Sequence, residues 1–244
     1  MPEQRLKTTI AILGCGDVGA TLAYTLLQNP ICSEVLLVDP KKDLLEAQVR
    51  DLADATYGSR AATRIRAGTH REAGQADIVV ITAGAKQKPG ESRLSLLSRN
   101  LHILSSIFTS MSPLSPHTIL ILVANPVDIL THFARKLSGL PSSQVLGTGT
   151  SLDTARLRGA LADSLSISPS SINAFVLGEH GDSQFIPWST ATIGCTPLHL
   201  ALPSGTLTSE FKAEVEERTR GAAGAIIKAK GCTAQEIFLN QANL

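Results

Sequence analysis

The sequence predicts an α/β fold, in which a doubly wound parallel sheet is followed by a second, smaller α+β domain. Apolar runs stand at residues 8–13, 34–38, 77–82 and 118–124, and helical patterns follow the first, third and fourth of them. Strands that alternate with helices favour a parallel sheet. The runs are continuous rather than alternating, which is typical of strands that helices bury on both faces.

The first strand carries a nucleotide-binding pattern. Residues 8–13 lead into the turn GCGDVG, and an apolar-periodic helix follows it through Leu27. In such a turn the first glycine permits a tight bend, the second lets the backbone approach a pyrophosphate, and the third allows the helix to pack closely on the strand. A lone G-x-G-x-x-G is weak evidence, so the flanking strand and helix carry the prediction. The cofactor-binding residues expected here are Gly14, Gly16, Asp17, Val18 and Gly19.

The second strand ends at the position where such a unit recognises the ribose. It closes with Asp39, 20 residues beyond Gly19. A carboxylate there accepts hydrogen bonds from the ribose hydroxyls and repels a 2′-phosphate, which predicts a Rossmann domain that binds NAD rather than NADP. Lys41 and Lys42 act against this preference. The alternative is a glycine-rich turn in another kind of α/β protein.

Glycine, proline and polar residues follow the third and fourth strands. The segment AGAKQKPGESR comes directly after one, and NPVD follows the other. Ligands of parallel sheets gather at the carboxyl ends of the strands, so both segments belong to one rim. We therefore add Gly84 and Asn125 to the expected cofactor-binding residues.

Three polar residues in the second half predict chemistry on a small carboxylate. Asp153 and Arg156 stand three apart on a predicted helix, and His180 lies in the segment GEHGD. That spacing puts both helical side chains on one face. Arginine offers a planar fork of donors to a carboxylate, and an aspartate can fix the tautomer of a histidine. An imidazole, with an unperturbed pKa of about 6.5, exchanges protons near neutral pH. The alternative is a solvated surface pair of Asp153 and Arg156.

Composition narrows the classes of partner. The chain has 244 residues, 43% of them hydrophobic, and a net charge of +1 without a basic stripe, so neither nucleic acid nor a membrane surface is an expected partner. No apolar run approaches the roughly 18 residues of a membrane span. The scattered cysteines lack a CxxC pair, which predicts no metal site, no disulfide framework and a cytoplasmic location. They are Cys15, Cys32, Cys195 and Cys232.

The second half predicts a smaller domain after a connector of small residues at 147–150. Its expected elements are a helix at 151–165, a strand at 172–177 and a long helix at 209–230. We expect a first domain at residues 1–149 and a partial catalytic domain at residues 150–244.

Taken together, the motifs resemble those of the lactate/malate dehydrogenase family. GCGDVG, AGAKQKPGESR, ANPVD, LDTAR and GEHGD occur in the family's order and at family-like spacing, and the match extends from residue 8 to Thr233. The resemblance implies hydride transfer between a nicotinamide ring and the carbon that bears the substrate hydroxyl. It also implies that His180 is the acid and base, that Asp153 orients it, and that Arg156 binds the substrate carboxylate.

The resemblance assigns further substrate contacts to the loops. Arg93 would polarise the carbonyl from a closing lid, Asn125 would bind the substrate oxygen, and Thr233 would lie on the pocket wall. Gln87 stands where malate dehydrogenases carry an arginine, so a second substrate carboxylate would be left unpaired. This predicts an L-lactate dehydrogenase acting on lactate and pyruvate. Malate dehydrogenase stays the alternative, because Lys86 or Lys88 would rescue a dicarboxylate by turning inward.

The resemblance also bears on assembly and on the end of the chain. It implies a homodimer or homotetramer. Arg158 matches an arginine that binds a sugar bisphosphate in bacterial relatives, but Asn173 replaces the histidine, so that activation is not expected. After Ala234 the resemblance fades, whereas relatives continue. The chain is expected to be C-terminally shortened, and a catalytically inactive NAD-binding protein is a further alternative.

Overall fold

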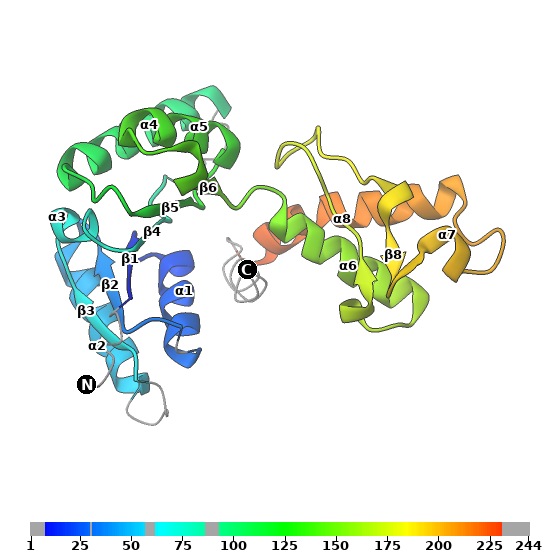
Figure 1. Cartoon of the computed structure of the whole chain (residues 1–244), viewed down its shortest axis with the longest axis horizontal. Helices are drawn as coiled ribbons and strands as arrows, with labels where there is room; N and C mark the ends of the chain where they lie inside the picture. The colour runs from blue at the N-terminus through cyan, green and yellow to red at the C-terminus, as the bar shows by residue number, and fades with distance from the viewer. Residues whose placement is uncertain (1–7, 30, 57–61, 86–92, 231–244) are drawn as a thin grey trace. The chain divides into compact units, whose positions relative to one another are not determined.

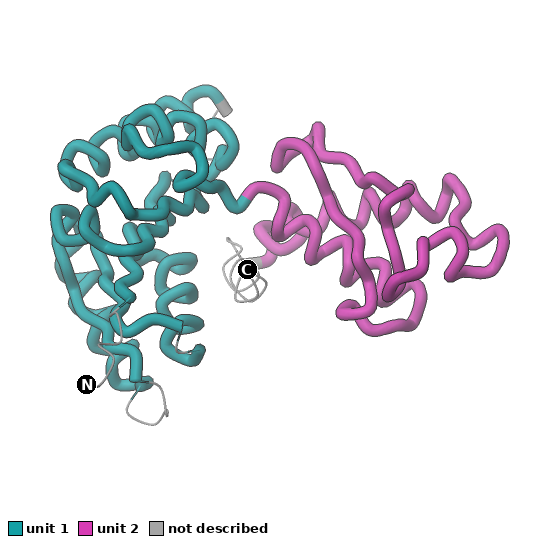
Figure 2. The backbone as a smooth tube through the Cα atoms, viewed as in Figure 1, with its two compact units in different colours: residues 1–148 teal, residues 149–244 magenta. Residues whose placement is uncertain are grey.

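The computed structural model describes residues 8–29, 31–56, 62–85 and 93–230. The chain divides into two compact units, Met1–Thr148 and Gly149–Leu244 (Figure 2). The division falls in the small-residue connector at 147–150. Each unit has its own sheet and its own hydrophobic core.

Unit 1 is built on a six-stranded parallel sheet with the strand order β3-β2-β1-β4-β5-β6 (Figure 1). All five strand pairs are parallel. The order reverses between β1 and β4, which is the arrangement of a doubly wound dinucleotide-binding sheet. The strands are β1 (Thr9–Leu13), β2 (Glu34–Val38), β3 (Arg64–Ala67), β4 (Ile78–Ile81), β5 (Ile119–Leu122) and β6 (Val145–Gly147).

Helices connect these strands and cover both faces of the sheet. Parallel strands need right-handed crossovers, so reversing the strand order moves the crossover helices to the opposite face. Accordingly, α1 and α2 lie on one side and α4 and α5 on the other (Figure 1). The helices are α1 (Asp17–Gln28), α2 (Lys42–Thr56), α3 (His70–Ala73), α4 (Arg93–Met111) and α5 (Val127–Ser138), and a 3-10 turn at Ser142–Gln144 precedes β6.

The register of the sheet brings the functional loops to one edge. Leu13, the last residue of β1, pairs with Val38 of β2 and with Ile81 of β4, and Ile81 pairs in turn with Leu122 of β5. Four strands therefore end in one row. The four side chains of this row, those of Leu13, Val38, Ile81 and Leu122, are almost fully buried, as the continuous apolar runs predict.

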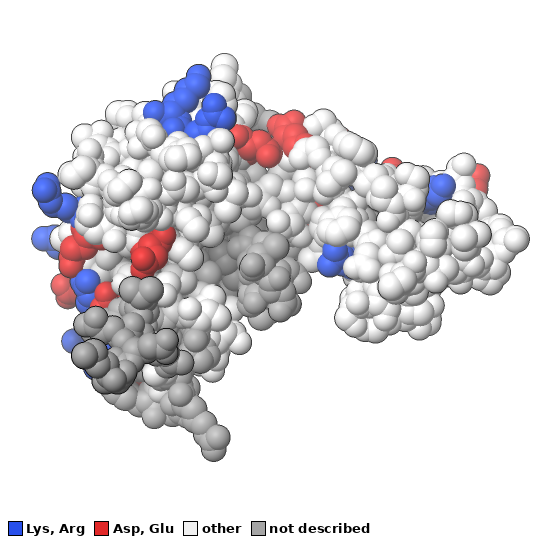
Figure 3. Space-filling view, viewed as in Figure 1, with Lys and Arg blue, Asp and Glu red and all other residues white. Residues whose placement is uncertain are grey.

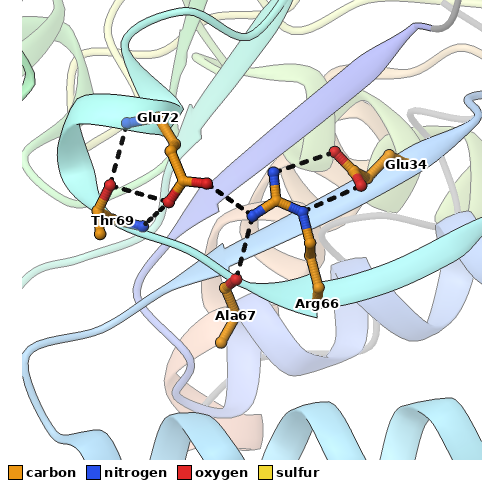
Figure 4. A network of polar contacts seen from close by, with 5 residues as sticks. All are labelled: Glu34, Arg66, Ala67, Thr69 and Glu72. Carbon is orange, nitrogen blue, oxygen red and sulfur yellow. Dashed lines mark hydrogen bonds and ion pairs between the residues drawn. The ribbon is translucent and has the colours of Figure 1, made fainter.

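The edge strand β3 was not predicted, because its sequence RIRA lacks an apolar run and three of its four residues are exposed. A polar network fixes it instead (Figure 4). Arg66 binds Glu34 of β2 through Nε–Oε1 at 3.0 Å and Glu72 of α3 through Nη1–Oε1 at 2.8 Å. Glu72 and Thr69 form a reciprocal capping box at the start of α3. Charged side chains on an exposed edge also discourage pairing with another chain.

Unit 2 packs two helices against short antiparallel strands. Its core includes Leu157 and Leu161 of α6, Val176, and Val215 of α8. The expected strand at 172–177 is only partly regular, since β7 ends at Asn173 and Leu177 makes a single bridge to Phe185. The elements are α6 (Ser151–Leu165), β7 (Ile172–Asn173), β8 (Thr192–Ile193), β9 (Thr196–Pro197), α7 (Leu198–Ala201) and α8 (Ser209–Lys230), with 3-10 turns at Pro169–Ser171 and Trp188–Thr190.

Among the described residues, no helix is both long and apolar enough to cross a membrane. Charged side chains lie in small, separate groups on the face that Figure 3 shows. The described part of that face therefore presents no continuous basic band.

Candidate functional site

The glycine turn after β1 is shaped by close contacts within unit 1. Gly14 has φ +105°, and a Cβ there would lie 2.8 Å from the backbone nitrogen of Ala83. A Cβ on Gly19 would lie 1.9 Å from the carbonyl oxygen of Gly14, so helix α1 approaches the turn as closely as a glycine allows. These two glycines are required by the fold itself.

Gly16 has a different explanation, because packing does not require it. A Cβ on Gly16 would meet no atom within 4 Å, and its backbone is extended, at φ −70° and ψ −171°. It is the N-cap of α1, and no side chain caps the helix there. Asp17 and Val18 are the first two helical residues. The turn therefore leaves open space before a helix N-terminus, where backbone N–H groups attract an anion, and this fits the pyrophosphate of a dinucleotide.

Asp39 is oriented by the backbone around it. Its Oδ2 accepts a hydrogen bond from the N–H of Cys15, in the glycine turn, and its Oδ1 accepts one from the N–H of Lys41, both at 2.9 Å. The carboxylate is thus held beside the turn, as a ribose contact requires. Burial and the negative charge of Asp39 raise the pKa of the Cys15 thiol to about 12, so this cysteine stays neutral. Burial lowers the pKa of His70, and the charge of Asp39 opposes that shift.

The loops after β4 and β5 meet through a residue that sequence reasoning missed. Asn100 of α4 accepts a hydrogen bond from the N–H of Ala85 and donates one to the carbonyl oxygen of Asn125, each at 2.7 Å. Gly84 lies at the same junction, where a Cβ would come within 3.0 Å of the Cβ of Ala124. The structure therefore brings Gly84 and Asn125 onto neighbouring loops at one edge of the sheet.

In unit 2 the structure brings Asp153, Arg156 and His180 together. Nδ1 of His180 lies 2.5 Å from Oδ2 of Asp153, and Nη1 of Arg156 lies 3.3 Å from Oδ1 of the same carboxylate. Asp153 is 3% exposed, so the pair is not the solvated surface pair that the sequence left open. A buried carboxylate that contacts Nδ1 favours the tautomer with its proton there and directs Nε2 to other chemistry.

Threonines of the α6 region hold the segment before His180. Thr150 donates its hydroxyl to the carbonyl oxygen of Val176 at 2.7 Å, and the N–H of Val176 donates to the hydroxyl of Thr154 at 3.0 Å. Arg158 donates through Nε to the carbonyl oxygen of Ala174 at 3.1 Å. Arg158 thus has a structural role in this unit. The only sequence signal for Thr154 was its place between Asp153 and Arg156 in LDTAR.

Some expected substrate contacts cannot be placed. Gln87 and Thr233 lie outside the described residues. Arg93 begins α4, but its side chain lies outside the description as well. Over the described ranges, no group of three or more histidine, cysteine, aspartate or glutamate residues is arranged to hold a metal ion.

Comparisons with known proteins match both units. The profile of the lactate/malate dehydrogenase NAD binding domain matches residues 8–147, and that of the family's alpha/beta C-terminal domain matches residues 150–237. L-lactate dehydrogenase A of Rhizopus oryzae is 51% identical over 232 residues, which cover 93% of this chain and 70% of that protein. L-lactate dehydrogenase 2 of Lactiplantibacillus plantarum is 45% identical over 224 residues, covering 92% and 71%.

Solved structures agree with these relatives. The crystal structure of the minor L-lactate dehydrogenase from Enterococcus mundtii has a TM-score of 0.91 and 33% identity, and the match covers 97% of this chain and 76% of that one. The NAD-binding turn, the acidic residue after β2 and the His180–Asp153 pair thus occur in a chain whose two units both match one family. The chain belongs to the lactate/malate dehydrogenase family.

Proposed function

We propose that this chain is an NAD-dependent L-lactate dehydrogenase that interconverts pyruvate and lactate. The observation that carries the proposal is the contact between Nδ1 of His180 and the buried carboxylate of Asp153, with Arg156 on the other oxygen of that carboxylate. The relatives named above, at 45–51% identity, are L-lactate dehydrogenases, which supports the choice within the family.

His180 has the geometry of a group that exchanges a proton with the substrate oxygen. The bound cofactor would supply the hydride as NADH and accept it as NAD+. As pyruvate is reduced, Nε2 of His180 gives its proton to the developing alkoxide, and in the reverse direction it takes the hydroxyl proton. Asp153 holds Nδ1 throughout and stabilises the imidazolium form, as the carboxylate of a catalytic triad does.

Arg156 has the chemistry to hold the substrate carboxylate. Its guanidinium is anchored to Asp153 at 3.3 Å, and its side chain is 9% exposed. A planar fork of donors binds a carboxylate bidentately, and partial burial strengthens that interaction. We assign Arg156 to the carboxylate that lactate and pyruvate share.

The remaining contacts are proposed from the family's motifs. Asn125 is assigned to the substrate oxygen and the cofactor, Arg93 to the polarisation of the carbonyl, and Thr233 to the pocket wall. Gln87 is assigned to the selection of a monocarboxylate, because a neutral amide leaves a second carboxylate unpaired. We also propose that the enzyme is a cytoplasmic homodimer or homotetramer. The free thiols of Cys15 and Cys32 fit a reducing compartment.

The oxidation of NADH with pyruvate and with oxaloacetate tests the substrate assignment. We expect a higher kcat/KM for pyruvate, and we expect the Gln87→Arg variant to shift the preference toward oxaloacetate. Faster turnover of oxaloacetate by the unaltered chain would make it a malate dehydrogenase. NADH binding without turnover of either substrate would make it an inactive NAD-binding protein.

A further inference from the structure

Asn100 joins two loops that are distant in sequence. It lies on α4, on the C-terminal side of the loop that follows β4, and only 3% of it is exposed. Its Oδ1 accepts from the N–H of Ala85, 15 residues earlier, and its Nδ2 donates to the carbonyl oxygen of Asn125, 25 residues later. Both distances are 2.7 Å, so the two polar atoms of this buried amide each have a backbone partner.

The two partners are next to residues with proposed roles in the reaction. Ala85 directly precedes the segment that contains Gln87, and Asn125 is itself assigned to the substrate oxygen. The loops also approach each other closely, since a Cβ on Gly84 would lie 3.0 Å from the Cβ of Ala124, in the loop after β5. A shift of the backbone at Ala85 relative to the loop after β5 would therefore displace Asn125, which is assigned to the substrate oxygen.

We propose that Asn100 is a positioning residue, which locks the backbone at Ala85 and the backbone at Asn125 in one register and so holds Asn125 in place for the substrate oxygen. The proposal rests on the proposed function. Asn100 acts through the backbone of Ala85 and Asn125. An amide suits this place because it offers one acceptor and one donor in a fixed plane, whereas a carboxylate offers only acceptors.

A matched control separates positioning from stability alone. Thr118 is fully buried, and its hydroxyl donates to the carbonyl oxygen of Ala76 at 2.7 Å. It precedes β5, so it lies at the amino end of the same sheet, away from the loops that Asn100 joins. Thr118→Val removes one buried hydrogen bond of unit 1 and preserves the shape of the threonine side chain. In the same way, Asn100→Asp removes the hydrogen bond that is donated to Asn125 and preserves the shape of the asparagine side chain.

The experiment compares kcat for pyruvate and the midpoint of urea unfolding in Asn100→Asp and Thr118→Val. A misplaced contact of about 1 Å costs up to about 100-fold in rate, so we expect Asn100→Asp to lower kcat between about ten- and 100-fold. We expect Thr118→Val to keep kcat within about twofold at a similar loss of stability. If both variants lose activity in proportion to stability, or if Asn100→Asp keeps its kcat, Asn100 is not a positioning residue.

A second readout does not depend on turnover. In Asn100→Ala the N–H of Ala85 loses its acceptor, so its amide hydrogen should exchange faster, together with the amides of the loop after β5. Thr118→Val should leave these amides protected. Unchanged exchange in Asn100→Ala would overturn the proposal. A chain that shows this exchange pattern but turns over no 2-oxo acid would refute the proposed function and retain Asn100 as the lock between the loops.

Discussion

Replacing Asp153 with asparagine is the substitution that probes the proton-exchanging pair most closely. The change preserves the shape of a side chain that is 3% exposed, but it removes the charge that contacts Nδ1 of His180 at 2.5 Å. An asparagine amide that donates to Nδ1 places the imidazole proton on Nε2 and no longer stabilises the imidazolium. We therefore expect a lower kcat in both directions.

The magnitude follows from the interaction that is lost. A hydrogen bond to a charged group contributes about 1.5–3 kcal/mol, and about 1.4 kcal/mol corresponds to tenfold, so kcat should fall by about 10- to 150-fold. The KM for pyruvate should rise as well, because Arg156 loses the carboxylate that anchors it at 3.3 Å. NADH affinity should not change, since the glycine turn and Asp39 belong to unit 1.

Steady-state NADH oxidation and NADH fluorescence titration measure these effects. Asp163→Asn is the matched control, because Asp163 lies on the same helix but its side chain is 65% exposed in an ion pair with Arg218. Exposed pairs contribute about 0–1 kcal/mol, so the control should retain kcat within about twofold. An Asp153→Asn variant with unchanged kcat would refute the role assigned to this carboxylate.

Two further predictions concern unit 1. Gly16→Ala should leave the midpoint of urea unfolding unchanged, because the added Cβ would meet no protein atom within 4 Å. It should weaken NADH binding, because the Cβ would occupy the space assigned to the pyrophosphate. Gly14→Ala should instead destabilise the fold, because Gly14 has φ +105°. If Gly16→Ala bound NADH normally, the turn would not be the pyrophosphate site. Hydrogen bonds from the backbone of Thr69, and then from Arg66, lower the pKa of Glu72. Its contribution to stability is therefore present above the ordinary glutamate pKa of 4.5 and is lost as the pH falls through the lower folded pKa. The unaltered chain should therefore have a higher free energy of unfolding than Glu72→Gln at pH 7, and urea unfolding should show this difference becoming smaller as the pH is lowered. A difference that stays constant from pH 7 to acidic pH would contradict the prediction.

The fold was predictable wherever a strand is buried on both sides. The expected strands at 8–13, 34–38, 77–82 and 118–124 correspond to β1, β2, β4 and β5, because central strands of a parallel sheet need continuous apolar sequences. Edge strands escape this rule. β3 is charged and mostly exposed, and β6 has three residues of which two are exposed, so neither carries an apolar signal.

The three residues that meet in unit 2 carry a motif signal, whereas the residues that support the site do not. Asp153 and Arg156 share a helix face, so their spacing predicts their proximity, whereas the contact of Asp153 with His180 joins residues 27 apart. Asn100 and Thr154 act by binding backbone groups of distant segments, and such contacts follow from tertiary packing rather than from local sequence. The strand expected at 172–177 is interrupted for the same reason, since side chains of α6 bind the backbone of Ala174 and Val176.

The proton exchange assigned to His180 is tested most directly by NADH oxidation with pyruvate, measured for the unaltered chain and for His180→Ala together with the NADH affinity of both. A positioned acid or base contributes about 10²- to 10⁴-fold, so His180→Ala should lose at least about 100-fold in kcat. It should bind NADH as the unaltered chain does, because the glycine turn is unaltered. A His180→Ala variant that reduces pyruvate at the unaltered rate would contradict the role of His180 in proton exchange.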